Sequence, residues 1–135
     1  MSAEQIMRTV LTAATAVTAV VGARIYPGEL PQGTAMPALG ISHISTTPMP
    51  RIDASAPQTL VQTRIEVTVL AKSYVTLKDL VKKVRAAANY QRGTIDGFSV
   101  VSITRETLGP DMRDSDLTLF TQTVDFMVVW FEPNP

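Results

Sequence analysis

The sequence predicts an α+β domain in which two helices cover one face of a mostly antiparallel four-stranded sheet, in the order α-β-β-α-β-β, with long proline-rich loops. Two segments carry apolar residues at every third or fourth position, which is typical of amphipathic helices. Other segments alternate apolar with polar residues, which is typical of strands with one buried face. The 135 residues, of which 45% are hydrophobic and 18% charged, favour a single domain over residues 1–135 with one core.

The first predicted helix covers residues 3–21. Ser2 can cap its start, Gln5 stands at the reciprocal position of a capping box, and Gly22 is a suitable terminator. One apolar stripe runs along it, made of Ile6, Val10, Ala13, Val17 and Val21. The many threonines, alanines and valines of this segment favour close packing against a sheet.

Residues 9–23 form an uncharged run of fifteen, whereas a membrane-spanning helix needs about twenty. The run also contains four threonines. A signal peptide is the alternative, because Arg8 precedes the apolar run, but Glu4 and the lack of a clear cleavage site weigh against it. We therefore expect a buried helix and no membrane association.

Residues 23–45 combine three of the nine prolines with three of the seven glycines, and apolar residues stand at both ends. A short strand over residues 38–45 closes the stretch. Ile25, Tyr26, Pro27 and Pro37 are expected to anchor and stiffen the segment before that strand. Because an enzyme lid usually needs hinges, we interpret the stretch as an ordered arm that contacts a partner. A second proline-rich loop covers residues 46–59.

The clearest strand covers residues 60–70, where apolar and polar residues alternate. A second helix is predicted over residues 77–89, with Thr76 as its cap. Val84 falls on its apolar stripe and Lys82 on its surface. Its basic residues are interpreted as a solvated face rather than a nucleic-acid site, because no aromatic residue is interleaved with them.

After a turn at residues 92–97, strands are predicted over residues 98–106 and 118–131, joined by a polar loop over residues 107–117. The last strand alternates in its first half, but from Met127 to Phe131 it is apolar on both faces. A sheet covered on one face does not need a second apolar face. Either another part of the chain or another subunit is expected to cover it.

No catalytic, metal-binding or cofactor-binding set is apparent. The chain has no cysteine, and His43 is its only histidine. The acids Asp111, Asp114 and Asp116 surround Arg113, but this run lacks the glycine and the distal glutamate of a calcium-binding loop. The net charge of zero gives no steering toward nucleic acid. We expect no cofactor, no metal and no enzymatic activity.

The stretch AVVGARIYPGELPQGTAMPALGISHIS resembles the start of the small tail-completion, or tail-terminator, proteins of long-tailed bacteriophages. The matching residues are Gly22, Arg24, Ile25, Tyr26, Pro27, Pro31, Gln32, Gly33 and Pro37. The segment AKSYVTLKDLVKKVRAAA is similar to the strand-then-helix unit of that family. The closing strand TQTVDFMVVWFEP, with Asp125 and Phe126, is similar to its last strand, so the resemblance covers nearly the whole chain.

The resemblance implies an α+β domain that assembles as a ring, commonly hexameric, at the head-proximal end of the tail. Such a ring ends tail-tube growth and joins the tail to the head, so its partners are the tail-tube protein and a neck or head-completion protein. DNA passes through without specific binding. The implied location is the virion, with assembly in the host cytoplasm. Two alternatives stay open: another neck or connector protein of similar fold, and a small-molecule-binding α+β module.

A cyclic ring needs two different, complementary patches on each subunit. The candidate patches are the apolar end of the last strand, with Met127, Trp130 and Phe131, and the polar loop, with Asp111, Arg113, Asp114 and Asp116. Charges in the loop can select the register of a contact. Aromatic and arginine side chains commonly carry interface energy, which makes Trp130, Phe131 and Arg113 the first choices.

Overall fold

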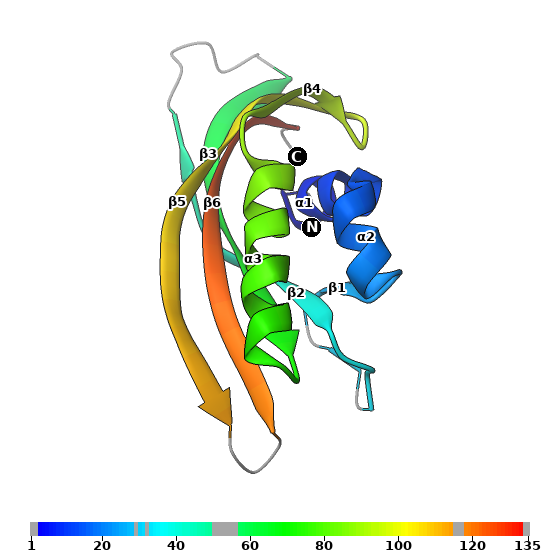
Figure 1. The fold of residues 1–135 in the computed structure, drawn as a ribbon. Helices are drawn as coiled ribbons and strands as arrows, with labels where there is room; N and C mark the ends of the chain where they lie inside the picture. The colour runs from blue at the N-terminus through cyan, green and yellow to red at the C-terminus, as the bar shows by residue number, and fades with distance from the viewer. Residues whose placement is uncertain (1–2, 29, 32, 50–56, 115–117, 134–135) are drawn as a thin grey trace.

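The computed structural model describes residues 3–28, 30–31, 33–49, 57–114 and 118–133. In these residues the strands form one mixed six-stranded sheet in the order β1-β2-β3-β6-β5-β4. Three helices lie on its concave side, so that the sheet curls around them as half of a barrel (Figure 1). The predicted four-stranded antiparallel sheet with two helices is therefore wrong.

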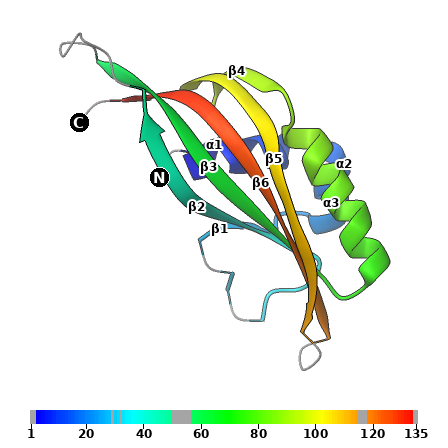
Figure 2. The same ribbon diagram turned by 90° about the vertical axis from the view of Figure 1, so that its left-hand side faces the viewer.

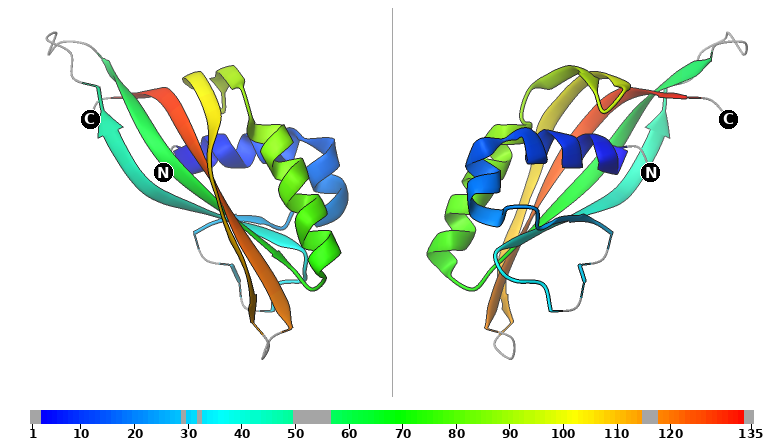
Figure 3. Two further views of the ribbon diagram at one scale, coloured as in Figure 1. Left: turned by 60° about the vertical axis from the view of Figure 1, so that its left-hand side comes forward. Right: turned by 90° about the vertical axis from the view of Figure 1, so that its right-hand side faces the viewer.

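The single first helix that the sequence predicts is divided into α1 (Ala3–Ala13) and α2 (Thr15–Val21). Ala14 between them is extended, with φ −83° and ψ 106°, and it turns the chain so that α2 packs against α3 (Tyr74–Ala88) (Figure 3). No glycine or proline marks the break, and the spacing of apolar residues by three or four positions continues across it. The sequence therefore predicts one helix. Four of the five predicted stripe residues, Ile6, Val10, Val17 and Val21, are buried on both sides of the bend. Ala13, next to the bend, is exposed, and the predicted cap Ser2 lies outside the described residues.

The centre of the sheet is the antiparallel pair of β3 (Gln58–Ala71) and β6 (Leu119–Pro133). Both are strands that the sequence predicts, over residues 60–70 and 118–131. Pairing runs from Gln58 opposite Pro133 to Ala71 opposite Phe120. Alternation places every second side chain under the helices, which buries Val61, Thr63, Ile65, Val67, Val69, Val124, Phe126, Val128 and Trp130. Burial of each large apolar side chain is worth about 1.5–3 kcal/mol, so these two strands hold much of the core.

One edge of the sheet contains a parallel pair that the sequence analysis missed. β1 (Ile25–Pro27) lies parallel to β2 (Ala38–Pro48), with Ile25 opposite Leu39. The chain returns to β2 through a cis peptide bond between Met36 and Pro37. Three residues are too few to show a strand period, and the surrounding glycines and prolines made the segment resemble a loop.

The other edge contains β4 (Gln91–Ile95) and β5 (Phe98–Asp114), which form a hairpin where a turn was predicted. Asp96 and Gly97 have φ values of 52° and 80°, as in the type I′ turns that join hairpins. β5 continues to Asp114, through register shifts around Leu108. The predicted polar loop at residues 107–117 is therefore largely strand, and Asp116 lies outside the described residues.

Two strand pairs project from the sheet at opposite ends (Figure 2). The far half of β5 pairs with the start of β6 and extends beyond the N-terminal end of α3, whereas β2 and β3 extend at the other end. The subunit is therefore elongated, and each end carries the strands of one hairpin.

Candidate assembly surfaces

The projecting part of the β5–β6 pair is fixed to the start of α3 by a polar network. The hydroxyl of Tyr74 donates a hydrogen bond to Asp111 Oδ2 at 2.7 Å, and Lys78 Nζ forms an ion pair with the same oxygen at 2.8 Å. Lys78 also donates to Gln122 Oε1 at 2.9 Å, and Gln122 Nε2 donates to the carbonyl of Gly109 at 2.8 Å. Tyr74, Lys78, Asp111 and Gln122 are called the hairpin clamp below.

The charges of the hairpin clamp stabilise each other. The hydrogen bond from Lys78 lowers the pKa of the Asp111 carboxyl, and the same bond raises the pKa of Lys78. Both side chains are well exposed, so solvent screening leaves the pair little weight in the stability of the fold. Its main effect is positional, because it sets where the hairpin lies relative to α3.

Aromatic contacts continue the hairpin clamp toward the tip. The guanidinium carbon of Arg113 lies 5.6 Å from the ring centroid of Phe120, and Phe120 meets Tyr74 edge-on at 5.8 Å. Met112 stands between Asp111 and Arg113 on β5, so its side chain points to the other face of the sheet, and it is 65% exposed. Asp111 and Arg113 therefore lie on the helix side of a strand rather than in a loop, and Asp114 is exposed at the end of that strand.

Trp130 lies in the core of the chain. Its side chain is 1% exposed, its Nε1 donates to Thr63 Oγ1 at 3.1 Å, and its ring meets Phe98 edge-on at 5.3 Å. The sequence predicts Trp130 as part of a subunit contact, in a segment from Met127 to Phe131 that is apolar on both faces. Burial under the helices gives Trp130 a structural role of its own, and the subunit contact stays a prediction.

The opposite, convex face of β6 carries Met127, Val129 and Phe131, and Leu60 of β3 lies opposite Phe131. All four side chains are half-buried. Among the described residues, no helix covers this side of the sheet (Figure 1). Leu60, Met127, Val129 and Phe131 are called the convex strip below, and they form the second apolar face that the sequence predicts.

The predicted arm is bonded to its own sheet at both ends. Ile25 is buried, Leu39 N donates to the carbonyl of Arg24 at 3.0 Å, and Arg24 Nε donates to the carbonyl of Pro37 at 2.9 Å. Tyr26 and Pro27 complete β1. Ile25, Tyr26 and Pro27 are therefore part of the sheet, whereas the anchoring role of these residues and of Pro37, and the contact of the segment with a partner, stay predictions.

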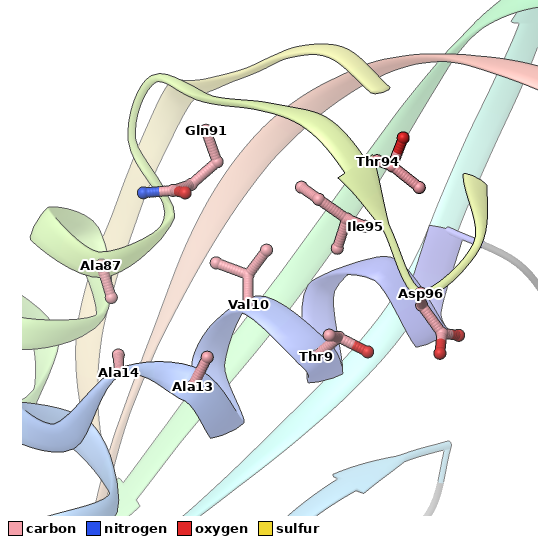
Figure 4. Close-up of a pocket in the computed structure, with 9 residues that line it drawn as sticks. All are labelled: Thr9, Val10, Ala13, Ala14, Ala87, Gln91, Thr94, Ile95 and Asp96. Carbon is pink, nitrogen blue, oxygen red and sulfur yellow. The ribbon is translucent and has the colours of Figure 1, made fainter. Parts of the chain in front are cut away.

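An open groove of about 340 Å³ lies between the end of α1, β4 and the end of α3 (Figure 4). It is lined by Thr9, Val10, Ala13, Ala14, Ala87, Gln91, Thr94, Ile95 and Asp96. Figure 4 shows Val10 and Ile95 facing each other, with Gln91 and Asp96 at opposite ends of the groove. A small-molecule site needs convergent polar groups. This groove lacks that arrangement among its lining residues.

His43, the lone histidine, is bonded to a threonine, with its Nε2 2.6 Å from Thr46 Oγ1. Across the described ranges, no three His, Asp or Glu side chains gather in a way that suits a metal ion. The helices of the described chain are too short or too polar to span a bilayer.

Comparison with known proteins identifies the family. The tail completion protein gp17 family matches residues 5–130. A solved structure described as "Virion of native gene transfer agent (GTA) particle" contains a chain with the same fold. The TM-score is 0.70, the identity is 14%, and the match covers 95% of this chain and 93% of that chain. No curated protein matches. The match along nearly the full sequence shows that this chain belongs to the tail completion protein gp17 family, a family of structural bacteriophage tail proteins.

Proposed function

We propose that this protein forms a ring at the head-proximal end of a phage tail, where it ends tail-tube growth and provides the surface that joins the head. The family match over residues 5–130 carries the proposal. The two strand pairs that project from opposite ends of the subunit support it, since a joining protein needs one contact at each end (Figure 2). The partners are the tail-tube protein at one end and a neck or head-completion protein at the other.

The ring is a homohexamer in this proposal, and the protein has no catalytic role. It assembles in the host cytoplasm and remains in the virion. The net charge of zero removes the repulsion that would oppose association of copies. For the contact between copies, the convex strip and the side of the β5–β6 pair that carries Arg113 supply two different patches, as a cyclic ring requires.

Native mass and tube assembly test the proposal. Light scattering should give the mass of six 14.6 kDa chains, and the protein added to growing tail-tube protein should limit tube length. A monomer at all concentrations would exclude the ring. A ring that binds heads and leaves tube growth unchanged would identify the alternative, a neck protein of similar fold.

Arg113→Glu should weaken the ring and leave the monomer folded. Arg113 is exposed near the end of β5, so its charge contributes little to the stability of the core. In the ring, charge pairs between subunits select the register of their contact, and a reversed charge repels the neighbouring subunit. Light scattering measures the oligomer, and circular dichroism measures the fold.

Arg92→Glu is the matched control, because Arg92 is an exposed cation on β4, away from the projecting end of the β5–β6 pair. An unchanged oligomer mass for Arg113→Glu would remove this strand end from the subunit contact. Loss of secondary structure would instead mean that Arg113 supports the fold through Phe120.

Duplex DNA is expected to bind weakly and to dissociate as salt rises, because a ring on the path of the genome must let DNA pass. The net charge is zero, and a groove that combines aromatic with basic side chains is not apparent in the sequence. Fluorescence anisotropy over a salt series measures this. Tight binding at physiological salt would contradict the expectation.

A further inference from the structure

A groove of about 400 Å³ between α3 and β5 is lined by four cations. Lys78, Lys82 and Arg85 follow one line along α3, at positions i, i+4 and i+7, and Arg105 enters from β5. The remaining lining residues are Val81, Ala86, Leu108 and Gln122. These eight residues are called the cationic groove below. Lys78 and Gln122 also belong to the hairpin clamp, whereas the other six residues belong to none of the surfaces described above.

The cations of this groove are unequally paired. Lys78 is bound by Asp111 within the hairpin clamp. In the described part of the chain, no carboxylate lies within ion-pair distance of Lys82, Arg85 or Arg105. Three like charges that line one hollow raise its local potential and attract an anionic group. Among the described residues, Asp111 is the one carboxylate at the end of the groove, which leaves the open part for an anionic group of another molecule.

The chemistry of the groove favours carboxylates on a polypeptide. Asp111 shows the mode of binding, since its carboxylate accepts from Tyr74 and pairs with Lys78 at the clamp end of the groove. Leu108 is 43% exposed, so an occupant also meets apolar surface. A phosphate backbone offers charge without apolar side chains, and the groove lining contains no aromatic ring on which a base can stack.

We propose that the cationic groove binds an acidic segment of a partner protein in which Asp or Glu residues alternate with apolar residues. The cations on α3 span two helical turns, about 10 Å, which is the length of about three residues of extended chain. Lys82 and Arg85 on one wall and Arg105 on the other contact carboxylates of the same segment, and Leu108 contacts its apolar side chains. This inference goes beyond the proposed function, because a single subunit contains the whole groove.

Fluorescence anisotropy at physiological salt tests the proposal on the full-length protein. The probe is a short labelled peptide that alternates glutamate with leucine. Three matched peptides replace its glutamates by lysine, its glutamates by glutamine, or its leucines by serine. The groove variant is Lys82→Gln/Arg85→Gln/Arg105→Gln. Its control, Arg8→Gln/Lys72→Gln/Arg92→Gln, removes three exposed cations that do not line the groove. Circular dichroism checks that both variants fold.

The glutamate–leucine peptide should bind, and the groove variant should weaken binding by about tenfold or more, whereas the control variant should stay within about twofold. The lysine and glutamine peptides should not bind, and the serine peptide should bind more weakly. No binding, equal loss in both variants, or equal binding of the serine peptide would overturn the proposal. Tighter binding of labelled duplex DNA that the groove variant alone abolishes would make this a nucleic-acid site and would also overturn it. The native mass of the ring is an independent measurement, so the two proposals fail separately.

Discussion

Val84→Asp is expected to prevent soluble folding. Val84 is 0% exposed, on the side of α3 that packs against the sheet. An aspartate there buries a charge, and the hydrophobic core around it offers no partner. The cost of an unpaired buried charge, about 3–5 kcal/mol, approaches the whole stability of an ordinary domain. Soluble yield, circular dichroism and thermal unfolding measure the effect.

Lys82→Ala is the control on the same helix. Lys82 is exposed, and its replacement should change the free energy of unfolding by no more than about 0.5 kcal/mol. Equal behaviour of the two variants would show that α3 presents a different face to the sheet.

Trp130→Ala should lower the free energy of unfolding by about 3–5 kcal/mol. The change removes the largest fully buried side chain and leaves Phe98 without its edge-on ring partner. It also removes the donor to Thr63, which is itself buried. Denaturant unfolding followed by circular dichroism measures the loss, since the variant has no tryptophan to report by fluorescence.

Two further variants separate the contributions at this position. Trp130→Phe keeps an aromatic ring but loses the hydrogen bond to Thr63, which is worth about 1 kcal/mol. Phe131→Ala changes the neighbouring side chain, which is half-buried on the convex strip, and should cost the monomer less than Trp130→Ala. An equal cost for Phe131→Ala would mean that the convex strip supports the monomer as much as the core does.

The long periodic elements could be predicted from the sequence. The phase of α3 is confirmed by buried Val84 and exposed Lys82, although the helix begins at Tyr74 and the predicted cap Thr76 lies within it. The central strands β3 and β6 lie where alternation placed them. The edges of the sheet could not be predicted in the same way. β1 has three residues, and β5 continues past Pro110, which an edge strand at a register shift tolerates.

β4 was not predicted as a strand, although the sequence contains a pattern that is typical of a hairpin at this place. Asp96 and Gly97 are a common type I′ hairpin pair, and this pair between two short segments could have indicated β4. The hairpin clamp carries no such signal, because Lys78 and Asp111 are brought together by the tertiary fold and no local period links them. The part of the convex strip on β6 belongs to the segment from Met127 to Phe131, whose apolar residues on both faces are visible in the sequence. The sequence did not indicate which of the two faces the helices cover.

The position of β6 has a consequence for how the protein is made. β6 follows every other described element along the chain, yet it lies between β3 and β5 in the sheet. A nascent chain that has not reached Leu119 has two unpaired strand edges at the centre of its sheet, and the final pairing joins residues far apart in sequence, which slows folding. Both the convex strip and the hairpin clamp draw residues from β6. The surfaces proposed for assembly therefore form only after β6 has left the ribosome, and a chain that lacks β6 does not present them.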